Sequence, residues 1–406
     1  MNKIINLEAI ISQITGRESS LFEKDIDNNK AKLAQEIENR NILVIGGAGT
    51  IGMNFIKALL RQAKPSKLVV IDINENGLTE LVRDIRSSND LNVPEVLLTY
   101  PINFSDSVFK KIFTAEKPFD IIANFAAHKH VRSEKDIFSI QAMVENNVIN
   151  AYNLLKLIEM NPPKHFFCVS TDKAANPVNI MGASKKLMED MILSFSDKIP
   201  VSTARFANVL FSNGSLPFGF IERVMKKQPF SVPSDVKRFF VSPRESGELC
   251  MLACIMGQSG DIFFPKLDEE KDMKPFTLVA EKFLDSLGYG LKQCSSEEEA
   301  RKYAENMEDN DQNYPVYYFK SDTSGEKAFE EFYTSDENVS LDEFCELGKV
   351  KTTEHKSGIE IEVLIENLNY IFSKGNLSKA EIVKFFNKAI PNFEHIEKGK
   401  SLDQKM

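Results

Sequence analysis

The sequence predicts an α/β fold with a doubly wound parallel sheet, a smaller mixed domain and an N-terminal helical appendage. Apolar strands alternate with amphipathic helices between about residues 41 and 209. A glycine-rich turn, GGAGTIG, follows the first strand directly, and Asp72 ends the second strand. Strands at this rhythm indicate βαβ units and a parallel sheet that helices cover on both faces. In such sheets the ligand crevice lies at the carboxyl ends of the strands.

The appendage comes first along the chain. Residues 1–38 contain two short helical stretches around Thr15-Gly16-Arg17, with apolar side chains at helical spacing. We expect these apolar faces to pack on the rest of the chain or on a second subunit. The strands expected next are ILVIGG, KLVVID, EVLLTYPI, DIIANFAA, HFFCVS and VSTARFANV, and the helices are 53–62, 77–88, 137–160 and 183–195.

Beyond Val209 the rhythm changes to segments punctuated by glycine and proline. They include a helix near 245–256, the strand-like DIFFPK and a helix over 275–287. This change predicts a smaller domain that binds the substrate. The expected division is 1–38 (N-terminal helices), 39–215 (parallel-sheet domain), 216–350 (substrate domain) and 351–406 (helical tail).

Composition excludes several classes of protein. A formal net charge of −9 argues against a nucleic-acid partner, whose binding surfaces are basic. No apolar run approaches the ~20 residues of a membrane helix, so we expect a cytoplasmic protein without a membrane partner. Five scattered cysteines without a CxxC pair fit reduced thiols. His128 and His130 lack carboxylate or thiol neighbours, so we expect no metal site.

The glycine-rich turn predicts a dinucleotide site in a Rossmann fold. Gly46, Gly49 and Gly52 allow a tight turn and a close approach of the backbone to a pyrophosphate at the start of a helix. Asp72 lies 72 − 52 = 20 residues beyond the last glycine. A carboxylate there accepts from ribose hydroxyls and repels a 2′-phosphate, which favours NAD over NADP. The turn residues Thr50 and Ile51 complete the expected phosphate contacts.

A group of proton donors and acceptors follows the strand HFFCVS. Thr171, Asp172 and Lys173 stand where side chains of a central strand reach the crevice, and Lys185 follows on the next helix. They could form an acid–base cluster. Equally, Thr171 and Asp172 could simply cap the next turn. Local sequence leaves both interpretations open.

Several separated motifs, in order, resemble the extended short-chain dehydrogenase/reductase family. Within it the chain is similar to UDP-N-acetylglucosamine 4,6-dehydratases of polysaccharide and nonulosonic acid biosynthesis. The resemblance covers about residues 41–335. The motifs are GGAGTIG, AAHKHV, Asn147-Val148 in the helix that follows it, STDKAANPVNIMGASK, RFANVLFSNGS, KRFFVSPRES and SGEKAFEEF.

The resemblance implies roles for individual residues. Lys173 would take the C5 proton, Asp172 would protonate the departing 6-hydroxyl, and Thr171 would hydrogen-bond O4. Lys173 must then be neutral, so we expect its pKa to be lowered by burial or by Lys185. Lys185 would hold the nicotinamide ribose, with Ala126 and Ala127 also beside the cofactor. The implied substrate-binding residues are Lys129, Met181, Asn208, Ser215, Arg238 and Glu245.

Departures from the family pattern leave alternatives open. Met181 stands where the family at large has tyrosine, and a thioether cannot act as a base. The O4 proton could go to Asp172, Lys173 or a bound water. Phe211 and Asn213 replace a glycine and an arginine, and Thr323 replaces an arginine, so UDP and GDP both remain possible.

The resemblance further implies a homo-oligomer, at least a dimer. Relatives that carry methionine imply retained configuration at C5. Two other functions remain open: a nucleotide-sugar 4-epimerase, and a catalytically silent dinucleotide-binding regulator.

Overall fold

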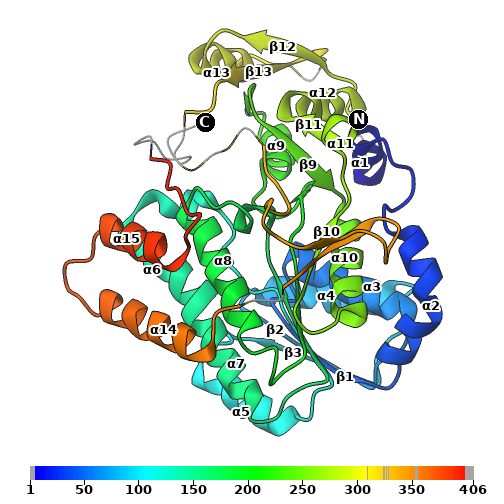
Figure 1. Cartoon of the computed structure of the whole chain (residues 1–406). Coiled ribbons are helices and arrows are strands. Elements are labelled where there is room, and N and C mark those ends of the chain that lie inside the picture. Colours follow the sequence, from blue (N-terminus) through cyan, green and yellow to red (C-terminus); the bar gives the residue numbers. More distant parts are fainter. Residues whose placement is uncertain are drawn as a thin grey trace.

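A nine-stranded sheet forms the centre of the larger of two lobes (Figure 1). The computed structural model describes residues 5–308, 310–322, 325, 327, 329–352 and 355–397. The strands lie in the order β14 (Val339–Ser340), β15 (Leu347–Lys351), β10 (Asp261–Pro265), β6 (Val201–Ala204), β5 (His165–Val169), β4 (Ile121–Asn124), β1 (Asn41–Ile45), β2 (Lys67–Asp72) and β3 (Val96–Pro101).

Seven neighbouring strands of this sheet, from β10 to β3, run parallel, and β15 and β14 add an antiparallel edge. The central strands are buried along nearly their whole length, because helices cover both faces. This arrangement confirms the doubly wound α/β fold.

Each face of the sheet has its own hydrophobic core. One core joins the sheet to α2 (Glu23–Ile37), α3 (Thr50–Gln62), α4 (Glu75–Ser87) and α10 (Pro243–Met256). The other core joins it to α5 (Ser107–Glu116), α6 (Ile137–Val144), α7 (Ala151–Glu159) and α8 (Ile180–Leu193).

Three segments differ from the sequence prediction. The long helix expected over 137–160 contains a π-helical stretch, η2 (Glu145–Asn150). VSTARFANV divides into β6 and β7 (Asn208–Val209), which belong to different sheets. DIFFPK forms β10 and pairs with β6 in the large sheet rather than in the smaller lobe. A boundary at residue 215 therefore does not separate the two lobes.

The smaller lobe contains two three-stranded sheets. In one, β9 (Lys237–Val241) lies between β7 and β11 (Met273–Pro275). In the other, β13 (Asn313–Phe319) lies between β12 (Gly290–Cys294) and β8 (Phe230–Pro233), all parallel. The helices of this part of the chain are α9 (Leu216–Met225), α11 (Glu269–Asp272), α12 (Phe276–Ser286) and α13 (Glu297–Glu305).

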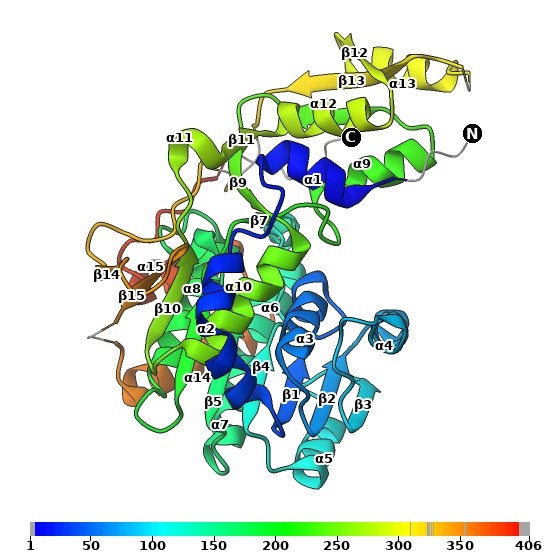
Figure 2. The ribbon, with the colours of Figure 1, turned by 90° about the vertical axis from the view of Figure 1, so that its right-hand side faces the viewer.

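The N-terminal helices connect the two lobes along one side (Figure 2). Ile10 and Ile14 of α1 (Leu7–Thr15) belong to the core of the smaller lobe, whereas Leu33 and Ile37 of α2 belong to the core of the larger one. The expectation that these apolar faces pack on the rest of the chain is confirmed for the residues described.

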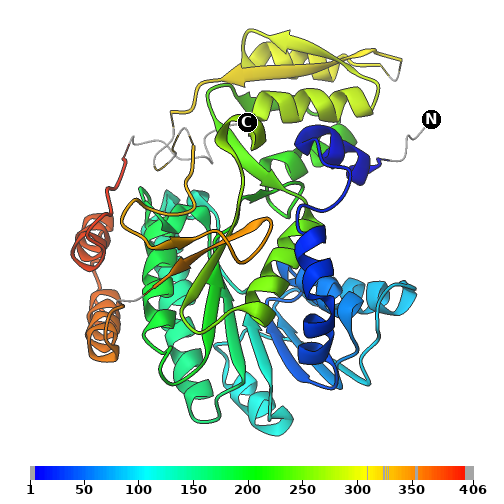
Figure 3. The ribbon, with the colours of Figure 1, turned by 45° about the vertical axis from the view of Figure 1, so that its right-hand side comes forward.

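The tail also forms two helices, α14 (Gly358–Phe372) and α15 (Lys379–Ala389). They lie on the outside of the larger lobe, where they are drawn in orange and red (Figure 3). There α15 packs against α8, and Glu362 of α14 pairs with Lys156 of α7 at 3.3 Å. Ile361, Ile365 and Phe386 extend the core on that face of the sheet. The loop after α15 then reaches the segment after β5, where Asn392 Nδ2 donates to the carbonyl of Ala175 at 3.0 Å.

Candidate active site

The predicted site residues gather at one edge of the large sheet. Gly46 follows β1, Asp72 ends β2, Ala126 follows β4 and Ser170 follows β5. These strands are parallel and adjacent, so their carboxyl ends lie together. This is the edge at which doubly wound sheets bind their ligands.

The three glycines of the turn differ in the space that a side-chain Cβ atom would have at each position. Gly46 has φ 77°, and a Cβ there would lie 2.5 Å from the Ala126 nitrogen. A Cβ on Gly52 would lie 2.3 Å from the Gly46 oxygen. A Cβ on Gly49 would meet only the Gly46 oxygen, at 3.5 Å, among the described atoms. The fold therefore needs Gly46 and Gly52, whereas Gly49 leaves room for a ligand.

The helix that begins at Thr50 is suited to an anion. Gly49 is its N-cap, and no side chain within the described part of the chain caps it. The first N–H groups of a helix carry a partial positive charge and bind phosphate oxygens. The Thr50 hydroxyl accepts from the Asn213 nitrogen at 3.1 Å, which brings the loop after β7 against this helix. The turn thus fits a pyrophosphate.

Asp72 has a structural role that the sequence did not predict. Its two carboxylate oxygens accept from the nitrogens of Ala48 and Asn74, both at 2.9 Å, and so brace the glycine turn. The side chain stays half-buried at the end of β2. A half-exposed carboxylate at this place fits the hydroxyls of an adenosine ribose.

Asn147 belongs to the family resemblance, but no role at the site was expected for it from the sequence. Its side chain donates to the His128 carbonyl at 2.9 Å and accepts from the His128 nitrogen at 2.9 Å. It also donates to the Ser184 hydroxyl at 3.1 Å. The π-helical stretch η2 turns this amide inward, and a π segment inside a helix often marks a functional site. Asn147 therefore fixes the segment that holds Ala126 and Ala127.

Thr171, Asp172 and Lys173 form one hydrogen-bonded group. Asp172 Oδ1 accepts from the Thr171 hydroxyl at 2.7 Å and from Lys173 Nζ at 2.9 Å. The side chain of Asp172 is 4% exposed and that of Lys173 is 17% exposed. A short 3-10 turn, η3 (Asp172–Ala174), holds both side chains at the end of β5. Asp172 Oδ1 also accepts from the Lys173 nitrogen of this turn at 2.9 Å, so the carboxylate has a local structural role, whereas the acid–base role stays a prediction.

The expectation that the pKa of Lys173 is lowered is wrong. Burial acts in that direction, but the Asp172 and Glu330 carboxylates outweigh it and raise the pKa of Lys173. Lys185 does not supply the expected repulsion, because its Nζ turns away to donate to the Val169 carbonyl at 2.7 Å. Lys173 therefore rests as an ammonium ion paired with Asp172.

Glu330 is a second residue that the sequence reasoning missed. It is 5% exposed, and its Oε1 lies 3.8 Å from Lys173 Nζ and 3.9 Å from an Arg238 guanidinium nitrogen. The sequence signal for Glu330 was the motif SGEKAFEEF, which has two adjacent glutamates before its final phenylalanine. Only the fold shows that Glu330 faces the cluster while Glu331 is exposed. Residues 323, 324, 326 and 328 of this segment, including Thr323, lie outside the described residues.

Lys185 and Met181 both face the protein interior. Lys185 is 3% exposed, and burial lowers its pKa. Met181 is 1% exposed and belongs to the core between the sheet and α8. Neither side chain reaches a surface of the crevice in this arrangement, so their expected roles toward ribose and substrate stay predictions.

The expected substrate-binding residues have different surroundings. Asn208 and Arg238 lie on the neighbouring strands β7 and β9. Lys129 is exposed, although surrounding protein lowers its pKa. Ser215 caps α9 by accepting from the Phe218 nitrogen at 3.2 Å. The structure thus joins Arg238 to the acid–base group through Glu330, and gives Ser215 a partner within its own helix.

Glu245 is engaged within the fold. Its side chain completes a capping box with Ser242 at the start of α10. It also pairs with Arg17 at 2.8 Å and accepts from the Leu21 nitrogen at 3.0 Å. This buried carboxylate therefore fastens the N-terminal segment, and its expected contact with substrate stays a prediction.

Phe211 shows how one departure from the family pattern is accommodated. It has φ 53°, a conformation that favours glycine, and the family carries glycine here. Its ring is 6% exposed and packs against Phe283, with the ring centroids 5.8 Å apart. Burial of the aromatic ring offsets the backbone strain.

The profile of the family described as "Polysaccharide biosynthesis protein" matches residues 42–352, more than half of the chain. The chain belongs to this family. It is an extended short-chain dehydrogenase/reductase. A Methanocaldococcus jannaschii relative, named "Uncharacterized membrane protein MJ1061", is 33% identical over 266 residues, which are 63% of this chain and 76% of that protein.

Other relatives carry enzyme names. A "UDP-N-acetylglucosamine 4,6-dehydratase (inverting)" of Campylobacter jejuni is 25% identical and covers 57% of this chain and 68% of that protein. A "UDP-glucose 4-epimerase" of Rickettsia bellii is 27% identical, and the match covers 76% of this chain and 95% of that protein. The chain spans only about half the length, 56% and 46%, of two further polysaccharide biosynthesis relatives.

The solved structure of "Pen from Bacillus thuringiensis" has the same fold. It matches with a TM-score of 0.61 and 21% identity, over 82% of this chain and 98% of that one. Within the described residues of this family member, no helix is long and apolar enough to cross a membrane. The same residues contain no group of three potential ligands that could hold a metal ion.

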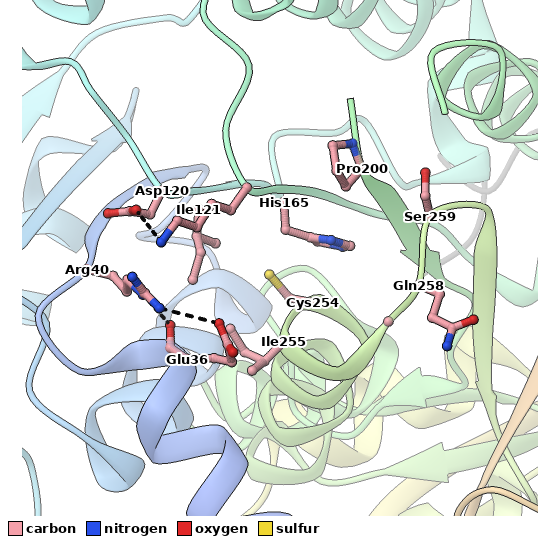
Figure 4. A pocket seen from close by; sticks show the side chains of 12 residues that line it. Glu36, Arg40, Asp120, Ile121, His165, Pro200, Cys254, Ile255, Gln258 and Ser259 are labelled. Carbon is pink, nitrogen blue, oxygen red and sulfur yellow. Dashed lines mark hydrogen bonds and ion pairs between the residues drawn. The ribbon is translucent and has the colours of Figure 1, made fainter. Parts of the chain in front are cut away.

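A cavity of about 390 Å³ lies at the opposite edge of the sheet (Figure 4). Asp120, His165 and Pro200, which line it, stand at the starts of β4, β5 and β6. It is therefore separated from the acid–base group by the length of the strands. Its charged groups are already paired, with Lys164 3.3 Å from Asp120.

Proposed function

We propose that the protein is an NAD-dependent 4,6-dehydratase that converts UDP-N-acetylglucosamine to the UDP-4-keto-6-deoxy sugar. The observation that carries this proposal is the 2.9 Å hydrogen bond from Lys173 Nζ to Asp172 Oδ1 beside a dinucleotide turn. The reaction oxidises C4 with release of the O4 proton, eliminates water across C5 and C6, and returns the hydride to C6 and a proton to C5. It needs a base at C5 and an acid at O6, and the pair supplies both.

One proton transfer prepares the pair for elimination. At rest Lys173 is an ammonium ion and Asp172 accepts its hydrogen bond. If the proton moves from Nζ to Oδ1, the N–H bond breaks, an O–H bond forms, and the result is a neutral amine and a carboxylic acid. The amine then takes the C5 proton, while the carboxylic acid protonates the departing 6-hydroxyl. The raised pKa of Lys173 is thus compatible with its role as a base.

The cofactor site uses the residues at the ends of β1, β2 and β4. The turn from Gly46 to Gly52 would hold the pyrophosphate, and Asp72 would bind the adenosine ribose. Ala126 and Ala127 would border the nicotinamide. The chemistry that NAD supplies when bound is acceptance of a hydride from C4 and its return to C6. We expect NAD to bind more tightly than NADP because Asp72 repels a 2′-phosphate.

A nucleotide-sugar 4-epimerase is the second candidate, because a relative carries that name. An epimerase shares the hydride step but eliminates no water, so it does not need an acid and a base at C5 and C6. The buried Asp172–Lys173 pair therefore favours the dehydratase. The same intact cluster disfavours a catalytically silent regulator.

The decisive experiment is incubation of the protein with NAD and UDP-N-acetylglucosamine, with product analysis by mass spectrometry. A dehydratase gives a product lighter by one water, whereas an epimerase gives a product of unchanged mass. Parallel incubations with GDP-linked hexoses identify the nucleotide. Absence of a dehydrated product from every nucleotide sugar, under conditions where NAD binds, would contradict the proposal.

Two finer parts of the proposal have separate measurements. We expect retained configuration at C5, which proton NMR couplings of the product report, although the Campylobacter relative is named "inverting". We also expect a homo-oligomer of at least two chains in the cytoplasm. Light scattering during gel filtration and fractionation of cells measure these two properties.

A further inference from the structure

Glu330 is a buried carboxylate that lies beside the acid–base group formed by Thr171, Asp172 and Lys173. It lies in the segment between β13 and β14. Two residues farther on, the Phe332 carbonyl accepts from Arg205 at 3.0 Å. The Arg205 guanidinium is itself fully buried and pairs with Glu189 of α8 at 2.8 Å. The larger lobe therefore holds the backbone at Phe332, two residues beyond Glu330.

The surroundings of Glu330 combine charges from several elements. Lys173 of η3 lies 3.8 Å away and Arg238 of β9 lies 3.9 Å away. Asp172, next to Lys173, and Lys327, on the same segment as Glu330, also act on it. Glu330 thus lies between Arg238, which the resemblance implies binds substrate, and Lys173, the expected base.

We infer that Glu330 is a positioning residue that holds Lys173 beside Asp172 and sets the pH at which Lys173 releases its proton. Lys173 Nζ is held between two carboxylates, at 2.9 Å from Asp172 and 3.8 Å from Glu330. If Lys173 moved away from Asp172, the buried carboxylate of Glu330 would lose one of its neighbouring cations. Such a loss costs free energy, so Glu330 favours the position of Lys173 beside Asp172. The role in catalysis rests on the proposed function, whereas the effect on Lys173 itself does not.

The sign of the effect follows from charge. A carboxylate within ~4–6 Å favours the protonated form of an amine, by ~1–3 pH units. Removing the charge of Glu330 should therefore let Lys173 become neutral at lower pH. Burial raises the pKa of Glu330, and Asp172 adds to this, whereas Lys173, Arg238 and Lys327 oppose it. The three cations therefore favour the ionised form of Glu330, which is the form that acts on Lys173.

The test compares Glu330→Gln with the matched control Glu331→Gln. Glu331 is the adjacent residue, exposed, and its side chain accepts from Asn176 at 2.8 Å. The first measurement needs no substrate: the pH dependence of Lys173 labelling by an amine-reactive reagent, followed by mass spectrometry of its peptide. We expect the labelling midpoint to fall by about one pH unit or more in Glu330→Gln. It should be unchanged in Glu331→Gln.

The second measurement uses the substrate that the unmodified protein converts. In Glu330→Gln the alkaline limb of the kcat profile, at which the Asp172–Lys173 pair loses its shared proton, should move to lower pH by the same interval, with kcat affected more than KM. A purely structural role would lower activity without moving the profile. Failure of the unmodified enzyme to dehydrate any nucleotide sugar would contradict the proposed function and leave the labelling test valid.

Two outcomes would overturn the inference: an unchanged labelling midpoint in Glu330→Gln, or an equal shift in Glu331→Gln. Thermal unfolding of each variant verifies that it is folded. If Glu330→Gln does not fold, Glu330→Met removes the charge with similar volume and with no buried polar group, and the same criteria apply. Glu330→Asp keeps the charge, so its labelling midpoint should lie close to that of the unmodified protein.

Discussion

Replacing Gly49 and Gly52 by alanine should separate cofactor binding from folding. Gly49 has φ −74° and ψ 161°, which any residue adopts, and its Cβ would have 3.5 Å to the nearest described atom. Gly49→Ala should therefore change the free energy of unfolding by less than ~1 kcal/mol, because only the entropy of the unfolded chain and a small capping difference are involved.

Gly52→Ala meets a different environment. Its Cβ would lie 2.3 Å from the Gly46 oxygen and 2.9 Å from the Gly47 Cα, and these backbone atoms cannot rotate away. Overpacking of this kind costs ~1–3 kcal/mol or more, and the helix propensity of alanine returns only ~1 kcal/mol. Because the clash is with backbone atoms, the upper end of this range applies, and we expect a net loss of about 2 kcal/mol or more.

The assay is urea unfolding followed by circular dichroism, together with calorimetric titration of NAD. Gly49→Ala should keep near-native stability but bind NAD at least ~10-fold more weakly, since the methyl group occupies the approach of the pyrophosphate. If Gly49→Ala binds NAD like the unmodified protein, or destabilises the fold as much as Gly52→Ala, the interpretation of the turn is wrong.

Three further predictions concern buried groups. Arg205→Leu should destabilise the fold by ~3–5 kcal/mol because it leaves Glu189 buried and unpaired, and adding Glu189→Leu should recover part of the loss in urea unfolding. Burial lowers the pKa of His165 from 6.5 to about 4, so the unfolded chain binds more protons between these values and stability should fall as pH falls through this window. The loss is about 3 kcal/mol in total, and pH-dependent unfolding of His165→Gln should lack this part. Met181→Leu should change stability by less than ~1.5 kcal/mol and keep turnover, whereas Lys173→Ala should lose ~10²–10⁴-fold; equal losses would contradict the assigned roles.

The sequence alone determined the fold class and the centre of the site, because both depend on local patterns. Apolar strands alternating with helices predict a parallel sheet, and the carboxyl ends of its strands lie together. The turn from Gly46 to Gly52 and the adjacent residues Thr171, Asp172 and Lys173 could therefore be placed at one edge. Adjacent residues at the end of one strand share a location in any such fold.

The tertiary structure decided which residues from distant segments complete that edge. DIFFPK shows the same apolar pattern whether it joins the large sheet or a separate one, so only its pairing with β6 placed it. Burial acts to lower the pKa of Lys173, but Asp172 and Glu330 together raise it. Glu330 comes from a distant segment, which the buried Arg205 holds at the Phe332 carbonyl. Burial by itself predicts a lowered pKa, and electrostatic interactions act through space. Their balance is therefore fixed only when the chain has folded.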